Sequence, residues 1–203
     1  MTKSIFRPKK ALNGLLLLTT LSIAGCVSTS STVTTDFYTV RGQTSQQIDR
    51  DLRRKGPLKG HALASAAIRF TPVSVLQAQS ADGCRFSTAK FKVIANITLP
   101  RWQDRNATDD RNLRRAWDGL ATYAKLHEET HVKIAEIYAQ KLGSTLMALP
   151  PQKTCSRLDK QAEKVVGTIS REHDRAQKTF DAREQARLAR LFKEAERRSR
   201  SQS

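Results

Sequence analysis

Hydrophobic and polar positions follow two different periods along this chain. Over residues 84–99 hydrophobic side chains alternate with polar ones, which is the period of a strand buried on one face. From residue 108 onward hydrophobic side chains recur at steps of three and four, which is the period of an amphipathic helix. The pattern therefore predicts a small sheet followed by long helices, an α+β fold.

The strand over residues 84–99 is the best defined. Its predicted buried face carries Phe91, Val93, Ala95, Ile97 and Leu99, and Pro100 is expected to end it. Two shorter strands are predicted over residues 36–40 and 62–71, with a short amphipathic helix over residues 44–55 between them. We expect the strands to form a small antiparallel sheet.

Two long helices are predicted after the sheet. The first begins near Thr108, a possible N-cap, and ends near residue 149. The second covers residues 156–198. We expect the sheet to pack on the first helix and the second helix to lie antiparallel beside it. The inward face of the first helix carries Leu113, Trp117, Leu120, Ala124, His127, His131, Ile134 and Tyr138.

The amino-terminal segment has the features of an export signal. Residues 1–10 contain four basic and no acidic side chains, and residues 11–25 form an apolar run too short for a confident membrane span. The run ends in Leu21-Ser22-Ile23-Ala24-Gly25-Cys26, which resembles a bacterial lipobox. The resemblance implies cleavage before Cys26 and acylation of its thiol. Val27, rather than Asp, follows the cysteine, which favours the outer membrane.

Charge and composition narrow the function classes. The net charge is +17, and removing the four basic residues of the signal leaves +13, so contact with anionic envelope polymers or lipid headgroups is plausible. The sequence has no glycine-rich phosphate loop, which argues against nucleotide binding. Nucleic-acid binding fits the charge but not the export signal or the low aromatic content.

Two cysteines remain after lipidation of Cys26. Because exported proteins mature in an oxidising compartment, we predict that Cys84 and Cys155 form a disulfide. A bond that closes a loop of this length stabilises the fold by about 4 kcal/mol in the chain-entropy description.

The candidate chemistry lies in His127-Glu128-Glu129-Thr130-His131. Two histidines four residues apart lie on one helix face, where both imidazoles can reach one metal ion. This is the H-E-x-x-H arrangement of zinc hydrolases, in which the carboxylate after the first histidine acts as general base. We therefore predict that His127 and His131 bind Zn²⁺ and that Glu128 is catalytic.

A third protein ligand is required, and the extended motif with a downstream histidine is absent because residues 134 and 137 are both isoleucine. The second long helix is the simplest source of this ligand. Its candidates are His173, Asp174, Asp181 and Glu184, with His61 as a more distant alternative.

Over residues 37–186 the chain resembles a family of bacterial envelope proteins described as predicted secreted zinc-dependent proteases, still formally of unknown function. The shared features are Tyr38-Thr39-Val40 followed by Gly42, Gly56-Pro57, Cys84, Leu99-Pro100-Arg101-Trp102, Trp117, the H-E-x-x-H motif and Cys155. The family also carries an aromatic-Asp pair followed by Thr and then His-Gly. Phe180-Asp181 matches the pair, but Thr and His-Gly are missing here. If the aspartate is the third ligand in this family, the resemblance implies that Asp181 has this role here. If the later histidine is the ligand, the resemblance implies either that His173 or Glu184 replaces it or that this protein has lost activity.

Two functions follow from these features. The first is a zinc-dependent peptidase on the periplasmic face of the outer membrane, acting on a peptide, an envelope protein or a peptidoglycan cross-link. The second is a non-catalytic basic lipoprotein that binds an anionic polymer or an acidic partner. The expected organisation is a signal (1–25), a flexible tether (26–35), a zincin-like catalytic domain (36–186) and a basic helical tail (187–203).

Overall fold

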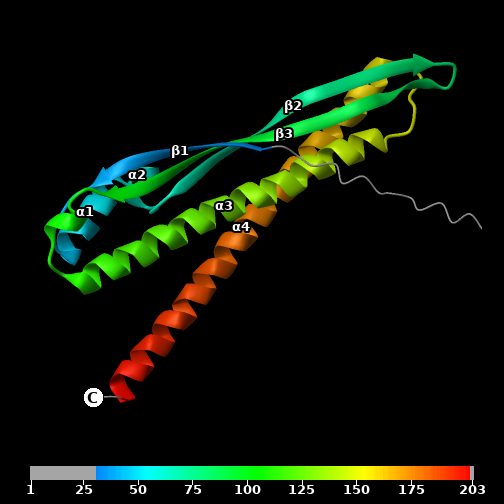
Figure 1. The fold of residues 1–203 in the computed structure, drawn as a ribbon. Helices are drawn as coiled ribbons and strands as arrows, with labels where there is room; N and C mark the ends of the chain where they lie inside the picture. The colour runs from blue at the N-terminus through cyan, green and yellow to red at the C-terminus, as the bar shows by residue number, and fades with distance from the viewer. Residues whose placement is uncertain (1–30, 202–203) are drawn as a thin grey trace, which may run out of the picture.

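The computed structural model describes residues 31–201, so the predicted export signal and the predicted lipidation site Cys26 lie outside the described residues. The expected α+β fold is confirmed: a three-stranded sheet lies on one long helix, and a second long helix crosses the first (Figure 1). The elements are, in order, β1 (Ser31–Val40), α1 (Ser45–Lys55), α2 (Pro57–Gly60), β2 (Ser65–Ser80), β3 (Gly83–Trp102), a short 3-10 helix (Arg105–Ala107), α3 (Arg111–Met147) and α4 (Cys155–Ser201).

The sheet has the order β1-β3-β2 and is mixed. β2 and β3 form an antiparallel hairpin, whereas β1 pairs with β3 in parallel from Ser31↔Val93 to Val40↔Trp102. The expectation of an antiparallel sheet is therefore wrong for one of the two pairings. The chain passes from β1 through α1 and α2, runs the length of β2 and turns back, so β3 returns in the direction of β1. Hydrophobic periodicity predicts a strand but not its direction.

All three strands are longer than the sequence predicted, and β2 covers Ser65–Ser80 instead of residues 62–71. β1 begins at Ser31, so residues 31–35 of the predicted tether are strand, consistent with their content of β-branched residues. β3 continues past Pro100 to Trp102. The pairing with β2 ends at Thr98, and beyond this point β3 pairs only with β1. Proline is tolerated there because one side of β3 no longer has a neighbouring strand that requires its N–H.

The alternation in β3 is confirmed, and its inward face packs on α3. Val93, Ala95, Ile97 and Leu99 are buried in one cluster with alanines and a valine of α3. Farther along α3, a Cβ added to Gly143 would lie 2.5 Å from the backbone oxygen of Ala89. Small residues therefore let α3 approach β3 closely, and this contact fixes the height of the motif helix above the sheet.

The amino-terminal end of α3 differs from the sequence prediction by a few residues. The N-cap is Asp110, whose carboxylate accepts hydrogen bonds from the N–H groups of Asn112 and Leu113. Thr108 instead accepts a hydrogen bond from the Asp110 N–H and donates one to Gln43 O. Thr108 thus orients the cap and connects it to the β1–α1 loop.

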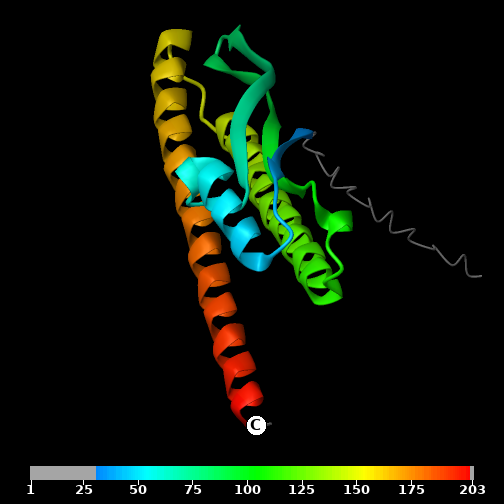
Figure 2. The same cartoon turned by 90° about the vertical axis from the view of Figure 1, so that its left-hand side faces the viewer.

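α4 is held at its amino-terminal end. The predicted disulfide is present: Cys84 at the start of β3 bonds to Cys155, the first residue of α4, with their Cα atoms 5.1 Å apart. Leu158 and Ile169 of α4 are buried against Leu142 and other side chains of α3 and β3. α4 then runs antiparallel to α3, crosses it and extends beyond it (Figures 1 and 2). None of the helices within residues 31–201 is long and apolar enough to cross a membrane.

Candidate metal centre

The two motif histidines lie on the side of α3 that faces α4. Their Nε2 atoms are 3.1 Å apart, although they come from successive helical turns. Asp181 of α4 lies opposite them, and its Oδ1 is 3.3 Å from His127 Nε2 and 2.9 Å from His131 Nε2. The three donor atoms therefore form a nearly equilateral triangle between the two helices.

The dimensions of this triangle fit a zinc ion. Zn–N and Zn–O bonds of about 2.0–2.1 Å place neighbouring ligands of a tetrahedron about 3.3–3.4 Å apart. The observed separations of 2.9–3.3 Å are close to this value, and two imidazoles with one carboxylate are a zinc-type donor set. His127, His131 and Asp181 form a group able to hold a metal ion within the described part of the chain. Three ligands leave a fourth tetrahedral position for water or substrate.

Aromatic side chains surround the imidazoles. The centroid of the Phe180 ring lies 4.8 Å from that of His127 and 5.0 Å from that of His131. Tyr123, one helical turn before His127 on α3, packs against the His127 ring. Burial lowers the pKa of His127, with His131 adding to the effect and Asp181 opposing it. The neutral form, which is the form that ligates metals, is thereby favoured at neutral pH.

Glu128 occupies a different face of α3. It is only 6 % exposed and belongs to the stripe facing the sheet, together with Ala124 and Val132. Burial raises the pKa of its carboxyl above the ordinary value. A carboxyl whose pKa is shifted toward neutrality suits proton transfer in both directions. The neighbouring Glu129 is instead partly exposed and pairs with Lys125.

The alternative third ligands lie outside the triangle. Glu184 is engaged by Arg187 and by the hydroxyl of Tyr123. His173 packs edge-on against Phe70, and Asp174 lies 3.6 Å from His173 Nδ1. His61 is exposed in the turn that follows α2.

Sequence reasoning missed one residue at this site, Gln177. Its Oε1 lies 2.6 Å from His131 Nδ1, the ring nitrogen that points away from the donor triangle. The signal was present in the spacing: Gln177 lies four residues before Asp181 and four after His173, on the same face of α4. A glutamine in a charged helix, however, has no pattern that marks it as a neighbour of a metal ligand.

Comparison with known proteins identifies the family of this chain. No curated protein and no solved structure matches it. Residues 35–187 match a family model, and this range contains the whole sheet except the first residues of β1, all of α3 and the part of α4 that carries Asp181. The chain belongs to the family described as bacterial protein of unknown function (DUF922).

Proposed function

We propose that this protein is a zinc-dependent peptidase of the cell envelope, anchored through Cys26. The observation that carries the proposal is the convergence of His127 Nε2, His131 Nε2 and Asp181 Oδ1 at tetrahedral spacing. The buried carboxylate of Glu128 directly follows the first of these ligands in the chain. A purely structural zinc site is normally closed by four protein ligands, whereas three ligands and a glutamate that directly follows the first histidine in the chain are typical of a hydrolytic site.

Each residue has a defined role in this proposal. His127, His131 and Asp181 would hold the ion, which would supply Lewis-acid polarisation of the scissile carbonyl and lower the pKa of a water. Glu128 takes a proton from the attacking water and delivers it to the leaving amine nitrogen. Phe180 packs against both imidazoles and would help to hold their rings in place. The substrate class is a peptide bond of an envelope protein or of a peptidoglycan cross-link.

The test compares metal content and peptidase activity in chains covering residues 27–203. We expect about one zinc ion per chain in the parent and none in a His127→Ala/His131→Ala variant. Glu128→Gln should keep the zinc and lose about 10²–10⁴-fold in hydrolysis of an unfolded protein or a cross-linked muropeptide. Glu129→Gln is the matched control and should behave like the parent. Absence of zinc from the parent, or full activity of Glu128→Gln, would contradict the proposal.

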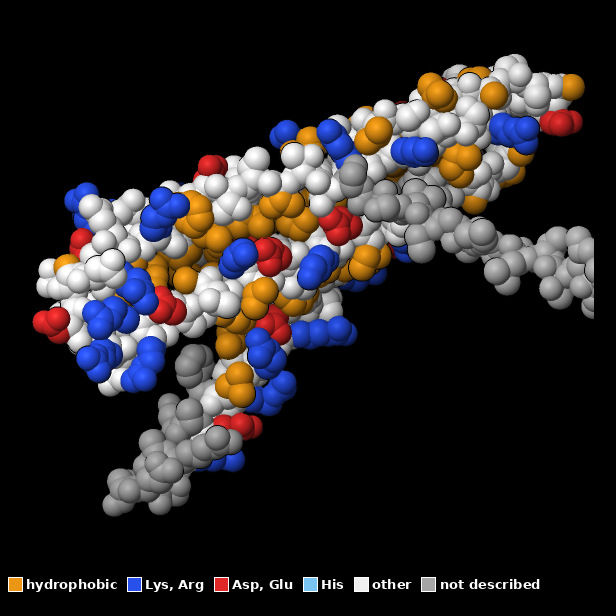
Figure 3. All heavy atoms as spheres, in the orientation of Figure 1, with side chains coloured by type: hydrophobic (Ala, Val, Ile, Leu, Met, Phe, Trp, Pro, Cys, Tyr) orange, Lys and Arg blue, Asp and Glu red, His pale blue; other side chains and the backbone are white. Residues whose placement is uncertain are grey.

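One observation favours a second function if zinc is absent. The part of α4 after Asp181 extends away from the sheet and displays basic side chains (Figure 3). Among the side chains of this segment whose burial is described, the exposed cations are Arg183, Arg187, Arg190, Lys193 and Arg197. A zinc-free protein with this surface would act as a binding lipoprotein for an anionic polymer or an acidic partner, and its affinity would fall steeply with salt.

A further inference from the structure

The hydrogen bonds behind the candidate metal ligands converge on Gln177 of α4. Its Oε1 lies 2.6 Å from His131 Nδ1, while its Nε2 lies 3.0 Å from the backbone oxygen of His131 and 2.8 Å from His173 Nε2. One amide side chain thus contacts two imidazoles and one backbone carbonyl. Both ends of the Gln177 amide have hydrogen-bond partners.

The backbone carbonyl decides which way this amide is turned. A carbonyl oxygen only accepts hydrogen bonds, so the group of Gln177 that faces His131 O must be the amino group. The amide oxygen then faces His131 Nδ1, and this oxygen also only accepts. His131 Nδ1 must therefore carry the ring proton. Its Nε2 is left with a bare lone pair directed at the donor triangle.

The same argument extends to His173. The second amino hydrogen of Gln177 points to His173 Nε2, which must accept it, so the proton of a neutral His173 ring lies on Nδ1. Burial lowers the pKa of His173, which favours this neutral form. Phe70 and Tyr138 pack edge-on against the ring at centroid distances of 5.0 and 5.7 Å. His173 is therefore held in place as an acceptor for Gln177.

We propose that Gln177 is a positioning residue that sets His131 in its metal-binding tautomer before any ion arrives, with His173 holding the Gln177 amide in the required orientation. The effect on metal binding rests on the proposed function, whereas the tautomer is a property of the metal-free protein. α4 would then supply both the third ligand, Asp181, and the residue that prepares the second. A side chain that orients a ligating imidazole typically contributes 10–100-fold to metal affinity.

The tautomer can be measured without metal. We would record long-range ¹H–¹⁵N correlation spectra of the four histidine rings in the metal-free chain of residues 27–203, which retains the whole described fold. The spectra are taken near pH 8, where free imidazoles are neutral. Wild type should show the proton on Nδ1 of His131 and on Nδ1 of His173. In Gln177→Met, the His131 ring should become a mixture of both tautomers.

Zinc affinity supplies the second readout, by competition with a chelator. Gln177→Met should bind zinc about 10–100-fold more weakly than wild type. His173→Phe, which keeps the ring packing but removes the acceptor, should show a smaller loss because His131 O still orients the amide. Gln161→Met is the matched control, because this glutamine is exposed on the same helix, and it should leave both readouts unchanged.

The outcomes separate this proposal from the proposed function. A wild-type His131 ring protonated on Nε2 overturns the positioning role, and no variant is needed to see it. An unchanged tautomer and zinc affinity in a folded Gln177→Met variant would also overturn it. If wild type shows the Nδ1–H tautomer and Gln177→Met loses it, but neither binds zinc, the positioning role stands and the peptidase proposal fails.

Discussion

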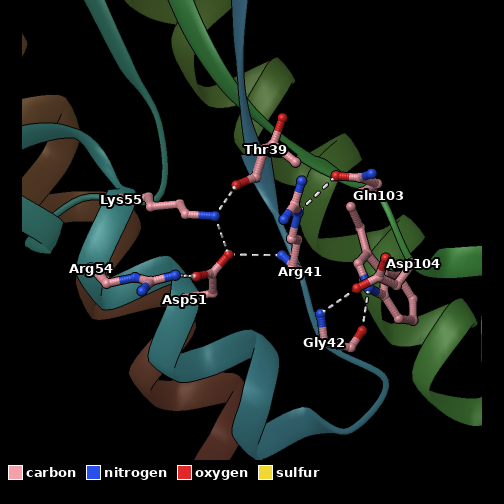
Figure 4. A network of polar contacts seen from close by, with 9 residues as sticks. Thr39, Arg41, Gly42, Asp51, Arg54, Lys55, Gln103 and Asp104 are labelled. Atoms are coloured by element: carbon pink, nitrogen blue, oxygen red, sulfur yellow. Dashed lines mark hydrogen bonds and ion pairs between the residues drawn. The ribbon is translucent and has the colours of Figure 1, made fainter.

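Asp51 on α1 and Asp181 on α4 both lie in polar clusters, but the two clusters are built in opposite ways. Asp51 is 6 % exposed and receives N–H donors from the Arg41 backbone, Lys55 and Arg54 (Figure 4). The side chain of Asp181 is about half exposed, and its nearest partners are two imidazole Nε2 atoms that also contact each other. Asp51 is enclosed by matching donors, whereas Asp181 faces two imidazole nitrogens that are themselves able to ligate a metal.

This difference separates a cluster whose charges are balanced within the protein from a group that could hold a metal ion. Burial alone would raise the pKa of Asp51, but hydrogen bonds from Lys55, Arg41 and Arg54 outweigh it and lower the pKa to about 2. Its charge is therefore satisfied within the protein, and it connects α1 to the end of β1. In the second cluster, His127 Nδ1 is buried without a hydrogen-bond partner among residues 31–201. Two imidazole nitrogens and a carboxylate oxygen that converge on one point form a donor set able to bind a cation.

Loss of the Cys84–Cys155 disulfide should have the largest effect and should separate the two regions. The bond anchors α4, which carries Asp181 but takes no part in the Asp51 cluster. We expect a Cys84→Ala/Cys155→Ala variant to lose about 4 kcal/mol in free energy of unfolding, measured by urea denaturation, and to bind zinc more weakly. Reductant should lower the stability of the parent and leave that of the variant unchanged. An equal denaturation midpoint in parent and variant would contradict this prediction.

Replacement of Asp181, the half-exposed carboxylate, should change zinc affinity but not the free energy of unfolding. We expect Asp181→Ala to weaken zinc binding by more than about 100-fold, since it removes a ligand and not only an outer-shell partner. The metal-free free energy of unfolding should stay within about 0.5 kcal/mol of wild type, because the side chain is half exposed. Asp159→Ala, an exposed aspartate on the same helix, is the control and should bind zinc normally. Unchanged zinc affinity of Asp181→Ala would exclude this residue as the third ligand.

Replacement of Asp51, the buried carboxylate, should change the free energy of unfolding but not zinc affinity. We expect Asp51→Asn to lose about 2 kcal/mol in free energy of unfolding at neutral pH and to bind zinc like wild type. Because folding lowers the pKa of Asp51 from 3.8 to about 2, its charge stabilises the fold fully above pH 3.8. This contribution disappears as the pH falls toward 2.

The measurement is the difference in stability between wild type and Asp51→Asn as a function of pH. The difference should be constant above pH 4 and shrink as the pH falls through the pKa of about 2. A difference that does not change with pH would show that the charge of Asp51 is not what stabilises this end of the molecule.

Several parts of the molecule were accessible from sequence because they depend on local periodicity or on simple chemistry. The alternation from Phe91 to Leu99 predicted the buried face of β3, and the i, i+4 spacing placed His127 and His131 on one side of α3. The disulfide was predicted from two cysteines in a chain with a predicted export signal. The parallel direction of β1 and its start at Ser31 were missed, because an edge strand with a polar exposed face has little alternation to detect.

By itself, the sequence determined which chemistry each helix can offer. The H-E-x-x-H motif brings two imidazoles together within one helix, where the 3.6-residue repeat sets their geometry, and it predicted four possible partners on α4. Only the tertiary structure shows that, among His173, Asp174, Asp181 and Glu184, it is Asp181 that lies beside both imidazoles. This position depends on the rotation and axial offset of α4 relative to α3. These are set by the disulfide and by the packing of Leu158 and Ile169, contacts that lie far along the helix from the site. The sequence predicted the disulfide, but no local pattern gives the rotation and offset that these contacts impose together.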